Sequence, residues 1–145
     1  MSPLVSAVDI QCPPAEVFPY VTDPSRFSEW QVGVVSGHCD GEPAVGARFT
    51  TTRRIRGADR TSTSEITEIS PPTSWSIRGI DGPIRAVMRV TVERRQGGEQ
   101  SHVTFSLDLS GHGFGKLILS RVISQARNEM PENCQKLKQR LERAS

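Results

Sequence analysis

The sequence predicts an α+β fold in which a seven-stranded antiparallel sheet packs against a long C-terminal helix, with two short helices between the first two strands. Segments of alternating apolar and polar residues succeed one another across Val32–Leu109, separated by short turns. These turns leave no room for the crossover helices that parallel neighbours need, so the strands are antiparallel. Apolar residues at helical spacing then continue towards the end of the chain.

The N-terminal elements are indicated by alternation and by prolines. Leu4–Ile10 is predicted as an edge strand, because its last residues alternate. Pro14 suits the first turn of a helix, where an N–H would have no partner. Asp23 followed by Pro24 predicts a second helix start, since an N-cap Asp accepts free amide bonds. Pro19 falls about five residues into the first helix, which should therefore be short or kinked.

Six further strands are predicted, each from an alternating segment bounded by Gly, Pro or Asp. Their ranges are Val32–Cys39, Ala47–Ile55, Arg60–Ile69, Ser74–Ile80, Ile84–Arg94 and His102–Leu109. The glycine-rich segment Ser110–Gly115 is expected to form a flexible link to the C-terminal helix.

The C-terminal helix is predicted from an apolar stripe whose members are three or four residues apart. The stripe consists of Leu119, Ile123, Ala126, Met130, Cys134, Leu137 and Leu141. Pro131 interrupts it and should bend or split the helix by clashing with the carbonyl four residues earlier.

Several short motifs share their order and spacing with a known family. The pattern Pro-x-x-Val-Phe-x-x-Val-x-Asp-Pro covers Pro14–Pro24 and is followed by Trp30; Gly46–Phe49 and Glu65–Pro72 then precede Trp75. Over nearly the whole chain they resemble the START-like SRPBCC superfamily, in particular its polyketide cyclase/dehydrase and lipid-transport branch. The resemblance implies a helix-grip fold, a curved sheet wrapped around the C-terminal helix.

Length and charge limit the possible functions. A chain of 145 residues and 16.0 kDa is expected to be one domain, residues 1–145, with room for a core and a modest cavity. The 18 basic and 16 acidic side chains leave a net charge of +2, which does not indicate nucleic acid or an anionic membrane as partner. Arginine provides 15 of the basic residues, which indicates a high-GC bacterium.

The cysteines and the N-terminus bear on location. Cys12, Cys39 and Cys134 are odd in number and far apart, so neither a disulfide framework nor a zinc site is indicated. No signal segment and no apolar run of about 18 residues is visible. We therefore expect a cytoplasmic protein with no membrane span.

Strand alternation also predicts which side chains face the helix. A mostly apolar cavity between a curved sheet and a helix is a ligand site by default. The expected ligand-binding residues are Trp30, Phe49, Thr51, Arg53, Ser64, Ile66, Trp75, Ile77, Ala86, Met88, Val90, Phe105, Leu107, Phe114, Leu119, Ile123 and Met130. For any one apolar residue, core packing is the simpler interpretation. An inward Arg53 needs a carboxylate or ligand oxygen, unless a bulge or strand end lets it reach water.

No catalytic constellation is evident. The three histidines fall on an outer strand face, a strand start and a glycine loop. Arg53, Tyr20 and Ser64 are the only candidates for handling a proton or stabilising an enolate. The spacing of His, Cys, Asp and Glu indicates no metal, the glycine-rich segment is no phosphate loop, and no cofactor is expected.

The leading interpretation is that the protein binds or carries a hydrophobic small molecule, a lipid or a polyketide-like compound. The alternative implied by the resemblance is a polyketide cyclase or dehydratase that acts on a ligand in the same cavity. A third class, a family member that acts by protein interaction, would use the outer face. The ligand's identity and the choice between monomer and homodimer stay open.

Overall fold

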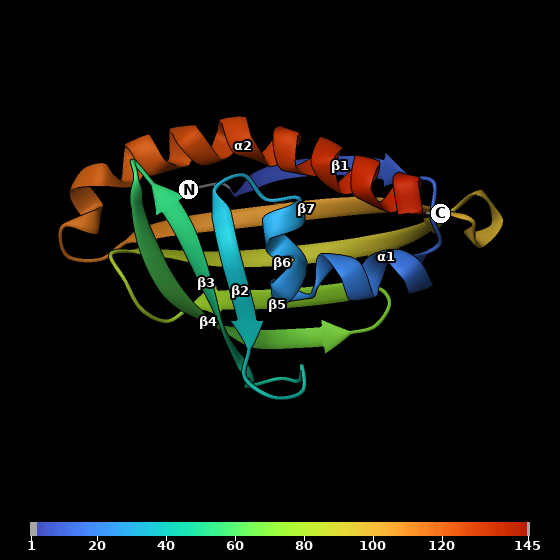
Figure 1. The fold of residues 1–145 in the computed structure, drawn as a ribbon, viewed down its shortest axis with the longest axis horizontal. Coiled ribbons are helices and arrows are strands. Elements are labelled where there is room, and N and C mark those ends of the chain that lie inside the picture. The colour runs from blue at the N-terminus through green and yellow to red at the C-terminus, as the bar shows by residue number, and fades with distance from the viewer. Residues whose placement is uncertain (1–2, 145) are drawn as a thin grey trace.

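A computed structural model describes residues 3–144. One antiparallel sheet contains seven strands in the order β1-β7-β6-β5-β4-β3-β2 (Figure 1), which confirms the predicted fold class. The strands are β1 (Leu4–Ile10), β2 (Val34–Cys39), β3 (Arg48–Ile55), β4 (Ala58–Ser70), β5 (Ser74–Gly79), β6 (Ile84–Arg95) and β7 (Gln100–Gly111). The helices are α1 (Pro14–Val21), the 3-10 turns η1 (Pro24–Glu29) and η2 (Gln96–Gly98), and α2 (Gly115–Ala144).

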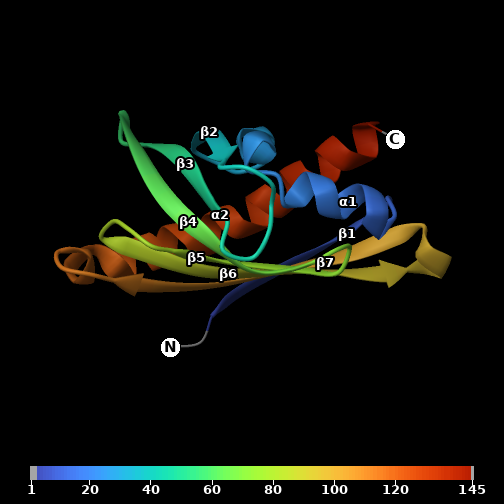
Figure 2. The same ribbon diagram turned by 90° about the horizontal axis from the view of Figure 1, so that it is seen from below.

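The sheet is curved, and the helices lie on its concave side. Figure 2 shows β3 and β4 rising out of the plane of β5, β6 and β7, towards the side that holds α1 and α2. Register shifts between Val34 and Ser36 on β2, and between Ile66 and Glu68 on β4, mark bulges. A bulge bends its strand and increases the local twist. The sheet therefore wraps around α2 as predicted.

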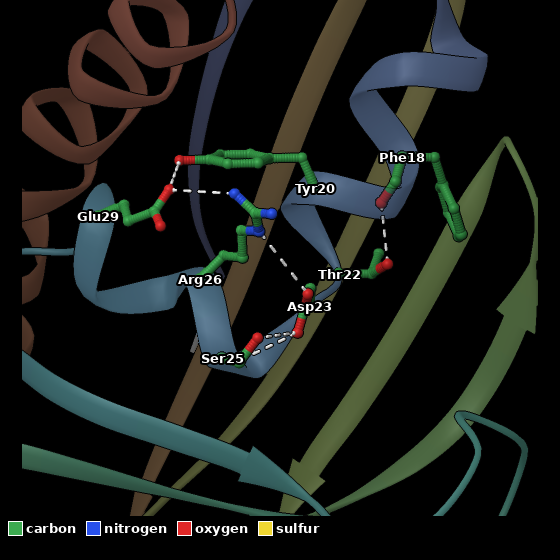
Figure 3. Close-up of polar contacts among 7 residues, drawn as sticks. All are labelled: Phe18, Tyr20, Thr22, Asp23, Ser25, Arg26 and Glu29. Carbon is green, nitrogen blue, oxygen red and sulfur yellow. Dashed lines mark hydrogen bonds and ion pairs between the residues drawn. The ribbon is translucent and has the colours of Figure 1, made fainter.

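The two short helices are stabilised by local capping. Helix α1 has only eight residues and contains Pro19, as expected. The Thr22 hydroxyl donates to the Phe18 carbonyl oxygen at its end, at 2.8 Å (Figure 3). The Asp23 carboxylate accepts from the backbone N–H of Ser25 at 3.0 Å, so the predicted cap is present, although the element it begins is a 3-10 turn.

Helix α2 runs unbroken for 30 residues through Pro131, so the alternative that Pro131 splits it is wrong. Pro131 is an exposed residue, and so is Arg127, whose carbonyl group loses its amide partner. Water can therefore satisfy the freed carbonyl group. Buried residues on the next turns hold the helix on the sheet beyond this point, among them Cys134 and Leu137.

The two halves of α2 differ in burial. Met130, Cys134, Leu137 and Leu141 belong to the main hydrophobic core. In the N-terminal half, Ile123 is buried outside that core, while other apolar side chains are only half-buried; these are Leu119, Val122 and Ala126. The predicted stripe is therefore continuous along the helix. Burial on it is less complete in the N-terminal half, although Ala126 still packs against the core.

Element boundaries differ modestly from those expected. Strand β4 starts at Ala58 rather than at Arg60, and β7 extends to Gly111, so the predicted flexible link is reduced to a turn over residues 112–114. The backbone N–H of His112 donates to the Pro83 carbonyl oxygen at 2.7 Å, which joins this turn to the β5–β6 connection. Among residues 3–144, no helix has both the length and the apolar character needed to cross a membrane.

Candidate functional site

Five aromatic side chains meet on the concave face of the sheet. This aromatic cluster consists of Phe27, Trp30, Phe49, Trp75 and Phe105, all buried. The Phe27 ring contacts three of the others edge-on, with centroid distances of 5.8 to 6.2 Å. Trp75 stacks on Phe49 at 5.9 Å, and Trp30 lies 5.6 Å from Phe105. The cluster joins η1 to strands β3, β5 and β7.

Both indoles of the aromatic cluster carry an unused donor. Trp30 is 3% exposed and Trp75 is 2% exposed. Neither Nε1 atom has a hydrogen-bond partner among the described residues. An indole N–H can only donate, and the rings around it offer no conventional acceptor. Most buried polar groups in proteins are paired, so two such donors in one cluster are a feature to explain.

Beyond the aromatic cluster, the concave face is incompletely buried. We call this region the open end and define it by Ser64, Ala86, Met88, Leu119 and Ala126. Each is half-buried. Ser64 pairs with buried Phe49, and Met88 pairs with buried Ile77 and Leu107, so both lie on the inner face. Ala86 shares that face because it is two residues from Met88 on β6. Small or half-buried side chains thus surround the N-terminal half of α2.

A row of polar groups borders this region, and we call it the polar seam: Gln31, Arg53, Glu129 and Asn133. Arg53 Nη2 donates to Gln31 Oε1 at 3.0 Å. The backbone N–H of Val32 donates to Asn133 Oδ1 at 2.8 Å. The polar seam therefore connects β3, the segment after η1 and the middle of α2.

Arg53 points inward, as alternation predicted, and it is half-buried. Burial lowers the pKa of its guanidinium group, while the negative charge of Glu129 acts in the opposite direction. Among the described residues it forms one hydrogen bond, to the neutral amide of Gln31, and no ion pair. Of the two alternatives for its environment, the strand end is present, and the Glu129 carboxylate acts on Arg53 without forming an ion pair with it.

The three candidate catalytic residues are not brought together. Figure 3 shows the Tyr20 hydroxyl directed at Glu29, to which it donates at 2.8 Å, and the Arg26 guanidinium lies 5.7 Å from the Tyr20 ring centre. Burial and the hydrogen bond to Glu29 raise the pKa of Tyr20 well above its ordinary value. Ser64 pairs with Phe49 in the sheet, four residues along β3 from Arg53. At about 3.3 Å per residue this separates Ser64 and Arg53 by roughly 13 Å.

Most of the other predicted ligand-binding residues lie in the interior. Thr51, Ile66, Ile77, Val90, Phe105, Leu107, Ile123 and Met130 are buried. Phe114 is the exception: it is 66% exposed in the turn before α2, because helix α2 starts only at Gly115 and leaves that ring outside the sheet.

Sequence reasoning missed four residues of this region. Phe27 lies at the centre of the aromatic cluster, and its position three residues after Pro24 was the available signal. Gln31 follows Trp30 in a segment without periodicity. Glu129 and Asn133 lie one helical turn apart beside the apolar stripe, a spacing that polar residues on a helix flank commonly share.

A hollow of about 350 Å³ lies elsewhere, between η1 and the C-terminal half of α2. Polar side chains line it: Ser28, Glu29, Lys136, Gln139, Arg140 and Arg143. Its charged walls differ from the apolar open end. Among residues 3–144, no group of three or more His, Cys, Asp or Glu side chains is placed to hold a metal ion.

The curved antiparallel sheet, the long C-terminal helix and the two short helices after the first strand together form a helix-grip fold, which a START superfamily protein of known structure shares. The model of the polyketide cyclase/dehydrase and lipid transport family matches residues 3–142, and the chain belongs to that family. No curated protein matches the chain.

Solved structures share the fold at low sequence identity. A protein designated TTHA0849 from Thermus thermophilus has a TM-score of 0.80 at 17% identity, over 99% of both chains. The Zhui aromatase/cyclase from Streptomyces sp. R1128 has a TM-score of 0.79 at 11% identity, over 97% of this chain and 93% of that one. A START superfamily protein from Mycobacterium smegmatis has a TM-score of 0.74 at 10% identity, over 100% of both chains.

Proposed function

We propose that this chain binds a hydrophobic small molecule, a lipid or a polyketide-like compound, between the concave face of its sheet and the N-terminal half of α2. The observation that carries the proposal is the incomplete burial of the open end. Ala86, Met88 and Leu119 belong to faces that turn inward, yet they remain half-buried. If α2 served only to complete the core, burial would continue along its whole stripe. An apolar ligand in this region would complete it.

The chemistry of the surrounding side chains supports an apolar occupant. Buried aliphatic and aromatic residues such as Ile77, Leu107 and Phe49 border the open end. Ser64 is the one polar residue among the five that define the open end, and the charged groups lie apart from it in the polar seam. Sites of this composition bind through apolar area and use a small number of polar contacts for orientation.

The family also includes lipid-transport proteins, so a carrier role in a bacterial cytoplasm fits this proposal. Among residues 3–144, Cys12, Cys39 and Cys134 form no disulfide, which fits a reducing compartment.

The first test is native mass spectrometry of protein purified without detergent, followed by organic extraction of whatever co-purifies. A stoichiometric apolar adduct is the expected result. Ala86→Trp should fill the open end and abolish the adduct. Val87→Trp is the matched control, because Val87 is the next residue on β6, is 55% exposed and faces away from α2. Undiminished ligand content in a folded Ala86→Trp variant would contradict the location.

A second candidate function is cyclisation or dehydration of a polyketide held in the same region. Arg53 favours it, because an inward guanidinium without an ion pair among the described residues, placed in a partly desolvated region, could stabilise an enolate. A candidate polyketide should lose turnover with Arg53→Ala and keep it with Arg54→Ala. Arg54 is the outward neighbour that pairs with Asp59 at 3.0 Å. Unchanged turnover in Arg53→Ala would remove Arg53 from the mechanism.

A further inference from the structure

The two unused indole donors constrain the chemistry of the ligand. Trp30 directly follows η1 and Trp75 lies in β5, and both rings contact Phe27. Their other ring contacts are with Phe105 and Phe49. Neither Nε1–H finds an acceptor among the described residues, although both residues are more than nine-tenths buried. Packing alone does not require this arrangement, because a phenyl ring would fill an apolar site without leaving a donor unpaired.

Register places Trp75 next to the open end, and Trp30 joins it through the Phe27 ring that both indoles contact. Trp75 precedes Ile77 by two residues on the inner face of β5, and Ile77 pairs with Met88 of the open end. Trp75 also stacks on Phe49, whose sheet partner is Ser64 of the open end. A ligand in the open end would therefore have the aromatic cluster as one wall.

We infer that the ligand presents hydrogen-bond acceptor oxygens to the indole N–H groups of Trp30 and Trp75. This inference rests on the proposed binding function and narrows its ligand class. The favoured ligand is an apolar molecule that carries carbonyl oxygens, of ketone or ester type. A pure hydrocarbon of the same shape binds with lower affinity, because it leaves the indole donors unpaired. The aromatic cluster thus selects by donor position as well as by volume.

The test compares two probes of nearly the same shape, 9-fluorenone with a carbonyl group and fluorene without one. Their affinities for the wild-type protein, Trp30→Phe and Trp75→Phe are measured by isothermal titration calorimetry. Differences in hydrophobicity between the probes cancel when each variant is compared with wild type, as in a double-mutant cycle. We expect the substitution at whichever indole receives the single carbonyl oxygen to weaken fluorenone binding roughly two- to tenfold more than fluorene binding.

A second measurement uses the wild-type protein and needs no variant to fold. The chain contains two tryptophans, so a ¹H–¹⁵N spectrum has two indole signals. Fluorenone should move at least one indole proton downfield, in the direction of hydrogen bonding, relative to its position with fluorene.

The possible outcomes separate the two proposals. Selective loss of fluorenone affinity, together with the downfield shift, supports the inference. Equal losses for both probes in both Trp variants, with matching indole shifts, would show that the indoles act only as apolar surface and would overturn the inference while leaving the binding function intact. If neither probe binds the wild-type protein, the proposed binding function is itself contradicted.

Discussion

The C-terminal half of α2 packs in the main core and the N-terminal half borders the proposed ligand. A Leu→Ala substitution should therefore lower the free energy of unfolding by different amounts in the two halves. Leu137 is 0% exposed and belongs to the main core. Leu119 lies on the same stripe but is half-buried and belongs to the open end. Leu137→Ala removes a fully packed side chain and leaves a cavity, a change that costs about 3 kcal/mol, within the usual ~2–5 kcal/mol range. Leu119→Ala loses only part of the transfer free energy and opens no closed cavity, so we expect about 1 kcal/mol.

Urea unfolding of the ligand-free protein measures both costs. For a slope near ~2 kcal/mol per molar urea, the midpoint should fall by about 1.5 M in Leu137→Ala and by about 0.5 M in Leu119→Ala. Leu and Ala have similar helix propensities, so the comparison reports packing. Equal midpoint shifts at unchanged slope would mean that the N-terminal half of α2 is packed as tightly as the rest. That result would refute the open end and remove the main support for a ligand there.

Two further substitutions test how the remaining elements are held in place. Gly37→Ala should lower the free energy of unfolding by about 1–3 kcal/mol, because a Cβ atom there would lie 2.2 Å from the Pro24 carbonyl oxygen. The control Ser36→Ala, at an exposed residue, should change that free energy by less than ~0.5 kcal/mol. Similar effects at both sites would contradict the close approach of β2 to Pro24. Asn133→Ala should speed amide exchange at Val32, whose N–H donates to Asn133 Oδ1 at 2.8 Å, and an unchanged exchange rate would show that this hydrogen bond does not hold the segment.

Much of the fold could be predicted because it depends on local rules. A period of two placed Thr51 and Arg53 on the inner face; Thr51 is buried, and Arg53 pairs with buried Val34 on β2. Asp23 accepts the amide bond that its N-cap position predicted. The continuity of α2 through Pro131 was harder to predict from the sequence, because it depends on how the helix packs on both sides of one missing hydrogen bond.

The site was predicted less completely because its polar contacts join distant segments. Tyr20 was one of three candidates for handling a proton, but the orientation of the short helix α1 directs its hydroxyl to Glu29. Gln31 reaches Arg53 only because the chain after η1 crosses towards the middle of α2. No alternation or spacing rule specifies such a path. Buried faces follow from the pattern, whereas the partner of a polar side chain follows from the tertiary structure.

The unequal burial of α2 places the residues that stabilise the fold apart from those that we propose contact the ligand. Its C-terminal half is tied to the N-terminal strand by Lys138 Nζ, which donates to the Asp9 carbonyl oxygen at 3.0 Å, and by the backbone N–H of Gln11, which donates to Glu142 at 2.9 Å. Leu137 and its core neighbours pack there. Within residues 3–144 the N-terminal half has fewer such ties, so side chains such as Leu119 can change at a small cost in folding free energy. On the proposed function, ligand preference can therefore vary through the open end while the core half maintains the fold.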